Sequence, residues 1–375
     1  MLDFNVISDL NQKGSRIYSK LNEMGIIHEE EMPPPSPEDG RITFGSGYPS
    51  KAIEKFIGYY DRNSRIAYTP SMSILTDFSI ARAYCLYNKA GKSDIVYLDS
   101  RFDPERSESA KIALDKFRSI CGVKGYFTFY VERERRYVRA KGLSESSAVA
   151  AAVSSALVSN IFGYNVKAHS MLASRFAKFV SGSGTRSVFP GLSTWISYPG
   201  IQEPKCMAHE IKIDFSKIKI AMFPKYADYS TNQMHELSVK SPQYIPWVQN
   251  KFARFREIID RSFDLEDLLI RAEEEMLNLN SLLMSAGRVL QTEESLSLIE
   301  RIISFRKKNP GLYFTADTGP SILVMTLDEN LLKEFLETER DFYISGNIVK
   351  DSSPSASNAF RERGKAFFAS FTESP

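Results

Sequence analysis

The spacing of apolar residues predicts a helix over residues 1–28. Its apolar positions recur at helical intervals and are Phe4, Ile7, Leu10, Ile17, Leu21 and Met24. The next stretch, HEEEMPPPSPEDG at 28–40, cannot continue that helix because three consecutive prolines lack backbone N–H donors. We therefore expect residues 1–40 to form an N-terminal appendage with a proline-rich linker. The pattern leaves open whether this helix packs on the main body or binds a partner.

Strand-like and helix-like segments alternate after the linker. The stretch RITFGSGYPS predicts a strand and a turn, and SKAIEKFIGYY predicts a short helix with Ser50 as its N-cap. Residues 94–100 and 125–140 are rich in aromatic and β-branched side chains, which is typical of strands. This alternation predicts a mixed α/β domain over residues 41–204.

The segment KGLSESSAVAAAVSSALVSNIFG, residues 141–163, runs from a glycine turn and a serine cluster into a helix that is apolar on most sides. We expect that helix to be buried. Backbone N–H groups, hydroxyls and the positive end of the helix dipole at its start make an anion site. Upstream, Arg133, Arg135 and Arg139 share one strand parity, so they fit either a solvated face or a cationic wall above this site.

A further helix at about 168–180 runs into the loop VSGSGTRSVFPGLSTW, residues 180–195. Its glycines let the backbone approach a ligand, Ser181 and Ser183 supply hydroxyls, and Arg186 supplies a planar fork for a carboxylate or phosphate. The alternative is a plain loop that ends the helix.

The pattern of predicted secondary structure changes after about residue 205. Strands and long helices there predict a second, α+β domain over residues 205–375. The segments are strand–turn–strand at 208–223, long helical stretches at 247–285 and 292–308, strand–turn–strand at 311–328, a helix at 329–341, a short strand near 342–349, and a loop-like tail with one short helical patch.

Composition narrows the class of protein. With 375 residues, 43% of them hydrophobic, and a net charge of +2, the chain has no overall bias toward nucleic acid or an anionic membrane surface. No apolar run approaches about 18 residues, so no spanning helix is expected. Cys85, Cys121 and Cys206 form no CxxC pair and are odd in number, so we expect neither a disulfide framework nor a metal site, and a reducing cytoplasm fits.

Four blocks within residues 41–345 resemble the diphosphomevalonate decarboxylases, a branch of the GHMP-kinase superfamily. In chain order they are AIEKFIGYYD, KGLSESSA, VSGSGTRS and TADTGPS, and a weaker fifth block is YSTNQMHELSVKSP. The resemblance implies an α+β GHMP-kinase fold of two domains, an N-terminal domain with a ribosomal-S5-like βαβ unit and a C-terminal ferredoxin-like α/β sandwich. It also implies a homodimer that acts on a small phosphorylated mevalonate.

The same blocks imply the site residues. Asp317, Lys55 and Arg186 occupy the positions of the family's catalytic aspartate, lysine and arginine. The substrate-binding set implied by the motifs and their surroundings is Ser181, Ser183, Lys141, Ser146, Ser147 and Arg139. Arg186 would hold the substrate carboxylate, Lys55 with Lys141 the departing phosphate, and Asp317 the developing cation. The alternative for Asp317 is a turn residue before Gly319 and Pro320.

Departures from the family pattern fall on features tied to ATP. The phosphate loop is one residue longer and contains Glu145, whose charge would repel nucleotide phosphates unless a metal or a base offsets it. Tyr59 replaces a lysine, and TPSMS at 69–73 replaces an Asn-Ser-Ser stretch. We therefore expect the archaeal-type activity that needs no cofactor, the conversion of mevalonate 3,5-bisphosphate to isopentenyl phosphate, CO2 and phosphate.

Three alternative functions stay open at this point. An ATP-dependent decarboxylase of phosphomevalonate or diphosphomevalonate would need ATP and Mg2+. A mevalonate 3-kinase would release ADP without CO2, which the retained Asp/Lys/Arg set disfavours. A catalytically silent sensor or scaffold on the same fold would need none of these residues.

Overall fold

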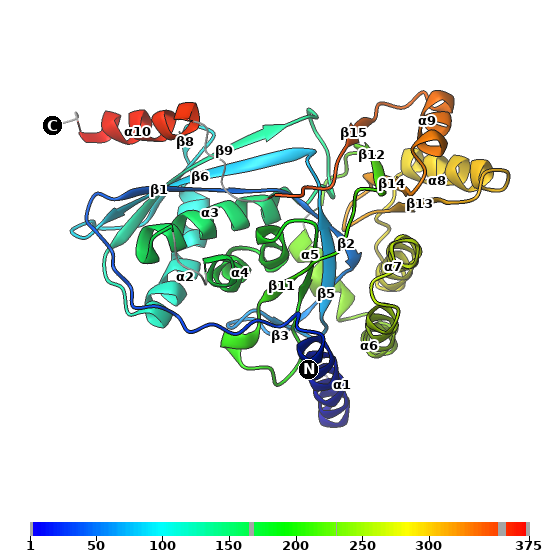
Figure 1. Ribbon diagram of the computed structural model, residues 1–375, viewed down its shortest axis with the longest axis horizontal. Coiled ribbons are helices and arrows are strands. Elements are labelled where there is room, and N and C mark those ends of the chain that lie inside the picture. Colours follow the sequence, from blue (N-terminus) through cyan, green and yellow to red (C-terminus); the bar gives the residue numbers. More distant parts are fainter. Residues whose placement is uncertain (1–2, 165–168, 230, 352–357, 373–375) are drawn as a thin grey trace.

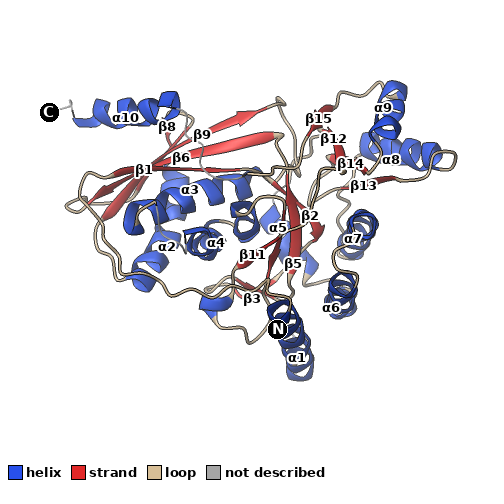
Figure 2. Cartoon of the chain, viewed as in Figure 1, coloured by secondary structure: helices blue, strands red, loops and turns tan. Residues whose placement is uncertain are grey.

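The structure is a computed structural model that describes residues 3–164, 169–229, 231–351 and 358–372 (Figure 1). Helices and strands alternate along the described chain and gather into separate sheets with helices packed on and between them (Figure 2). The α+β class predicted from the sequence is confirmed. Short elements outside the main sheets are β3 (Tyr59–Asp61), β4 (Ile66–Ala67), α5 (Thr231–Ser238) and the 3-10 turns at Gly182–Val188 and Glu203–Lys205.

A five-stranded sheet forms the wide part of the molecule. Its order is β1 (Ile42–Gly47), β6 (Ser79–Asn88), β9 (Tyr126–Arg135), β7 (Ile95–Leu98) and β8 (Arg101–Phe102). The neighbouring strands are antiparallel except β7 and β9, which run parallel. Helices α2 (Pro104–Cys121) and α3 (Glu145–Phe162) cover one face, and α4 (His169–Val180) packs on both of them and on β11 (Ala208–Ile211) (Figure 1).

The opposite face of this sheet is covered by α10 (Asn358–Thr372) (Figure 1). Phe360 and Phe368 pack against Phe44, Tyr84 and Tyr130 there. The sequence predicted only a short helical patch in this tail, because the apolar face of α10 becomes meaningful only once the sheet beneath it is known. Two segments of the tail that was predicted to be loop-like, residues 352–357 and 373–375, lie outside the described residues.

A second sheet crosses the centre of the molecule with the order β11 (Ala208–Ile211), β10 (Leu192–Trp195), β5 (Ser71–Leu75) and β2 (Ser50–Glu54). The short helix predicted from SKAIEKFIGYY is therefore wrong. All five residues of β2 are buried, and they pair with β5 through a bulge between Ala52 and Glu54. The apolar spacing fits a helix, but sheet pairing and buried ionic partners for Lys51 and Glu54 override that local preference.

The third sheet is antiparallel and has the order β13 (Leu312–Thr315), β14 (Ile322–Thr326), β12 (Lys219–Phe223) and β15 (Ile344–Gly346). The predicted strands at 208–223 are both present, but β11 and β12 lie in different sheets. The helices of this part are α6 (Tyr244–Asp260), α7 (Leu265–Ser285), α8 (Glu293–Arg306) and α9 (Glu329–Thr338).

The helical stretch predicted at 247–285 is divided into α6 and α7. Ser262 and Phe263 adopt φ values of 53° and 58°, a left-handed conformation that an α-helix cannot contain. Asp264 then caps α7 by accepting a hydrogen bond from the N–H of Asp267. The break is set by backbone conformation that the apolar spacing does not record.

The N-terminal helix α1 (Phe4–Glu23) packs against α6, which settles the choice left open by its sequence in favour of packing on the body. Leu10, Ile17 and Leu21 are buried at this contact. Gly14 lies so close to the ring of Tyr198 that a Cβ atom would come within 2.1 Å of its Cγ. The linker after α1 contains no helix or strand, as its prolines predicted.

The helix α3 is the buried core of the five-stranded part. Among the described residues it is one helix with the length and hydropathy of a membrane span, yet 78% of that window is buried in this fold. It packs on β1, β6 and α4. Its apolar composition is accounted for by burial in the protein, as the sequence predicted.

Candidate active site

Asp317 is the centre of the site and lies on the loop that follows β13. Its carboxylate is buried, with 3% of the residue exposed. Oδ1 accepts a hydrogen bond from Nζ of Lys55 at 3.0 Å, and Oδ2 accepts one from Oγ of Ser144 at 2.9 Å. The fold therefore brings together the two charged groups that the first and fourth sequence blocks carry, and adds a hydroxyl from the second block.

A second lysine, which the sequence analysis missed, also reaches Asp317. Nζ of Lys51 lies 3.5 Å from Oδ2 of Asp317 and donates a hydrogen bond to the carbonyl oxygen of Gly142. The spacing of four residues between Lys51 and Lys55 was visible in the sequence. The buried carboxylate that both lysines share could only be found from the fold.

The charges of the site are set by burial and by these neighbours. Burial alone would raise the pKa of Asp317, but Lys55 and Lys51 outweigh it and hold that pKa well below its ordinary value. Burial lowers the pKa of Lys51, and Asp317 opposes that shift only in part. Burial lowers the pKa of Arg186 to about 10, against the opposing effect of Asp317. Asp317 is thus ionised and Arg186 cationic near neutral pH.

Arg186 lies in the 3-10 turn after α4 and is almost completely buried. Its Nε donates to Oγ of Ser73 at 3.0 Å, and its Nη1 donates to Oγ of Ser71. Both serines belong to the TPSMS stretch on β5, so residues that depart from the family pattern support this arginine. In the described part of the chain Nη2 of Arg186 has no hydrogen-bond partner, and this residue is 1% exposed and is not among those that line the pocket beside Asp317.

A pocket of about 250 Å3 opens beside these groups. The predicted site residues that line it are Lys55, Lys141, Ser146, Ser183 and Asp317. Its wall otherwise comes from the loop before α3 and from Thr231 and Thr318. Residues from five separate parts of the sequence therefore meet around one cavity.

The other predicted site residues lie next to the lining. The hydroxyls of Ser181 and Ser183 are 3.3 Å apart. Ser147 is fully buried, where its hydroxyl donates to the carbonyl of Ser144 and accepts from the N–H of Ser50. The guanidinium of Arg139 lies 3.5 Å from the ring centroid of Tyr226. Contact with substrate stays a prediction for all of them.

Comparison with known proteins places this constellation in a family. The model of the family described as "Diphosphomevalonate decarboxylase-like N-terminal domain" matches residues 47–208. A protein of Thermoplasma acidophilum named mevalonate 3,5-bisphosphate decarboxylase is 47% identical over 341 residues, covering 91% of this chain and 84% of the relative. The chain belongs to the diphosphomevalonate decarboxylase-like family. A protein of the same name from Thermoplasma volcanium is 44% identical over 96% of this chain and 97% of that relative.

Solved structures give the fold of this diphosphomevalonate decarboxylase-like protein. The mevalonate diphosphate decarboxylase of Enterococcus faecalis matches with a TM-score of 0.72 at 20% identity, over 83% of this chain and 98% of that one. The mevalonate-3-kinase of Thermoplasma acidophilum matches with a TM-score of 0.68 at 18% identity, over 84% and 98%. The GHMP-kinase fold and the family resemblance derived from the sequence blocks are confirmed.

The phosphate loop of this family member has its extra carboxylate neutralised by protein groups. Glu145 begins α3, and its carboxylate accepts two hydrogen bonds of 2.8 Å from Arg135 and one of 2.7 Å from the hydroxyl of Tyr137. Arg133 pairs with Asp99. Arg135 and Arg133 are thus engaged with carboxylates, so they form neither a plain solvated face nor a free cationic wall.

The same loop is joined to the loop that carries Asp317. A Cβ atom built on Gly319 would lie 2.5 Å from the Cα of Gly142, so the two backbones are in direct contact. Ser321 donates to the carbonyl oxygen of Lys141 at 2.6 Å, and the N–H of Lys141 donates to the carbonyl oxygen of Lys225 at 2.8 Å. With the bond from Lys51, these contacts fix the loop that the resemblance assigns to ATP phosphates.

The fifth block contributes α5, whose His235 lies against the start of the site. Its Nδ1 accepts a hydrogen bond of 2.9 Å from the N–H of Gly58, and its ring stacks on Tyr59 at 5.4 Å. Burial, together with the nearby cations Lys55 and Arg65, lowers the pKa of His235 to about 3. Tyr59, where the family pattern has a lysine, therefore serves as an aromatic support. Ser230 of this block lies outside the described residues.

Proposed function

We propose that this protein is a mevalonate 3,5-bisphosphate decarboxylase that forms isopentenyl phosphate, CO2 and phosphate without ATP. The observation that carries the proposal is the ionised Asp317 held by two lysines at the edge of a polar pocket. The two Thermoplasma relatives that carry this name and match most of the chain support it.

The proposed chemistry is mainly electrostatic. The bond between C3 and the phosphate oxygen breaks with its electrons on the phosphate, leaving positive charge on a tertiary carbon. The bond between C2 and the carboxyl carbon then breaks, its electrons form the alkene, and CO2 leaves. Arg186 would hold the carboxylate, Lys55 and Lys141 would stabilise the departing phosphate, and Asp317 would stabilise the cationic carbon. Ser181 and Ser183 would orient the substrate.

Independence from ATP and Mg2+ is part of the proposal, and the joined loops support it. The carbonyl of Gly142 accepts a hydrogen bond from Lys51, and the backbones of Gly142 and Gly319 touch at the loop that resembles the family's phosphate loop. The carboxylate of Glu145 stands at the start of α3, the end of a helix that favours anions.

One assay tests the activity against its rivals. The protein is incubated with mevalonate 3,5-bisphosphate with and without ATP and Mg2+, and CO2, phosphate and ADP are measured. We expect equal amounts of CO2 and phosphate at a rate that ATP does not change. Strict dependence on ATP with a 5-phosphate or 5-diphosphate substrate would move the function to an ATP-dependent decarboxylase, and ADP without CO2 would indicate a kinase.

We further propose a cytoplasmic homodimer, formed through an apolar face on α7 and α8. Exposed apolar residues recur every seventh position, and they are Ile270, Leu277 and Met284 on α7, and Leu296 and Ile303 on α8. Both helices pack on β13, and a second copy of the chain would cover these exposed apolar side chains. Light scattering should give twice the 42.5 kDa chain mass, and Leu277→Glu should give the monomer.

A further inference from the structure

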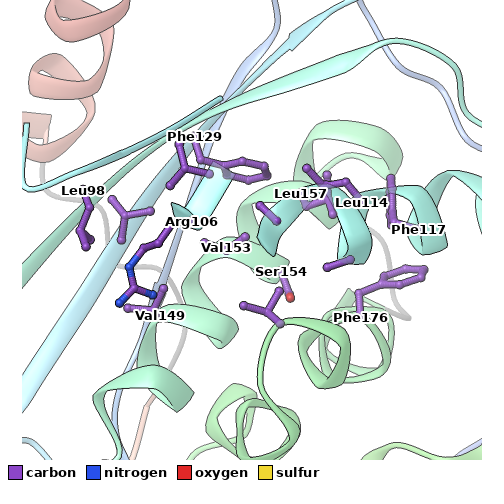
Figure 3. A pocket seen from close by; sticks show the side chains of 15 residues that line it. Leu98, Arg106, Leu114, Phe117, Phe129, Val149, Val153, Ser154, Leu157 and Phe176 are labelled. Carbon is purple, nitrogen blue, oxygen red and sulfur yellow. The ribbon is translucent and has the colours of Figure 1, made fainter. Parts of the chain in front are cut away.

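A second cavity, of about 160 Å3, lies inside the five-stranded part of the molecule (Figure 3). It lies between strands β7 and β9 and helices α2, α3 and α4, and it is open on one side. Its walls are apolar and include Leu114 and Phe117 from α2, Phe129 from β9, Val153 and Leu157 from α3, and Phe176 from α4. It is separate from the pocket at Asp317, since the two share no lining residue.

An apolar cavity of this size suits a small hydrocarbon group. Protein interiors are close-packed and contain few voids larger than a water molecule. An apolar cavity of about 150 Å3 stays dry and takes up a molecule such as benzene. The space here therefore matches a compact group of roughly five or six carbon atoms.

The open side of the cavity carries a cation. Arg106 is the charged residue among those lining the cavity, and its side chain stands between Leu98 and Val149 in Figure 3. Its side chain is 56% exposed, and its Nε lies 3.5 Å from Oδ2 of Asp103. That contact uses one edge of the guanidinium and leaves its two terminal nitrogens for an anion.

We propose that this cavity binds a phosphate ester of a branched five-carbon chain, with the chain inside and the phosphate on Arg106. The product of the proposed reaction, isopentenyl phosphate, has this chemistry, so its identity as the ligand rests on the proposed function. The preference of the cavity for such an ester does not depend on the proposed function. Helix α3 joins the two sites, because Val149 and Val153 line this cavity and Ser146 in the first turn lines the catalytic pocket.

The test uses calorimetry to measure how 3-methylbutyl phosphate binds to the wild-type protein and to variants. Some variants fill the cavity, and one removes the positive charge at its opening. Ala110→Leu and Val153→Phe fill it, and Arg106→Gln removes its charge. Val138→Phe and Arg101→Gln are matched controls, because Val138 is 99% exposed and neither residue lines the cavity. Thermal melts establish that each variant is folded, and Ala110→Leu, at a half-buried position, serves if Val153→Phe does not fold.

We expect the filling variants to lose one binding site or to weaken binding at least about tenfold. Arg106→Gln should weaken the ester and leave 3-methylbutanol unaffected, and the controls should bind as the wild type. Binding that is unchanged by all three cavity variants, or inorganic phosphate binding as tightly as the ester, would overturn the proposal. Calorimetry needs no turnover, so a protein that binds the ester but fails the decarboxylation assay refutes the proposed function alone.

Discussion

The ammonium group of Lys51 lies 3.5 Å from the carboxylate of Asp317 and also contacts the carbonyl oxygen of Gly142. One side chain thus links Asp317 to the loop before α3. Lys55 pairs with the same carboxylate, so two lysine side chains converge on one buried aspartate. Both lysines lower the pKa of Asp317 and keep it ionised.

Replacing Asp317 with asparagine should lower turnover of the 3,5-bisphosphate at least about 100-fold, because the group that faces the developing cation loses its charge. Steady-state kinetics would measure the loss, and circular dichroism would establish that the fold is intact. Asp260→Asn, at the exposed end of α6, is the matched control and should keep the wild-type rate. Near-normal turnover by Asp317→Asn with an intact fold would refute the assigned role.

Replacing Lys51 with methionine should destabilise the protein by about 3 kcal/mol, because a buried carboxylate loses one of its partners. Turnover should fall as well, since the loop before α3 loses its bond to the lysine. Denaturant unfolding and kcat measure the two effects. Lys333→Met removes an exposed ion pair of α9 and should cost less than about 1 kcal/mol. Equal stability of the two variants would contradict the linking role of Lys51.

Replacing Arg186 with lysine keeps the positive charge but removes the fork that Ser71 and Ser73 hold. We expect kcat/KM to fall by about 100-fold, because the substrate carboxylate would be misplaced relative to the breaking bond. Arg301→Lys on α8, which does not line the pocket, should leave the kinetics unchanged. A rise in KM alone, with kcat preserved, would show that Arg186 binds the substrate without orienting it for cleavage.

Acidification should destabilise the protein through His235. Its pKa falls from an ordinary 6.5 to about 3 in the folded state, so the stability gained by keeping it neutral is fully present above pH 6.5. That stability is lost as the pH falls from 6.5 toward 3, at up to about 1.4 kcal/mol per pH unit. His235→Gln keeps an acceptor for the N–H of Gly58 and does not titrate. Unfolding midpoints of the two proteins should therefore converge on acidification, and parallel curves would contradict this.

The sequence blocks were sufficient to predict the family, the fold and the meeting of Lys55 with Asp317, because the four blocks occur in the order in which the GHMP-kinase fold brings their residues to one site. Lys51 was not predicted, since its role depends on a carboxylate contributed by a distant loop. The strand β2 was mistaken for a helix because its residues are buried on both faces, so its sequence lacks the alternation of a half-exposed strand. The full extent of α10 was not predicted, because its apolar residues pack on a sheet face that exists only in the folded protein.

The contact between Gly142 and Gly319 limits how the enzyme can move. A cleft whose two rims touch backbone to backbone cannot swing wide as a hinge without breaking the bonds around Lys141 and Ser321. Substrate would then enter through the existing opening of the pocket, into a site assembled before it arrives. Such a site spends little entropy on ordering loops around its ligand, and it sets an upper size on any molecule it admits.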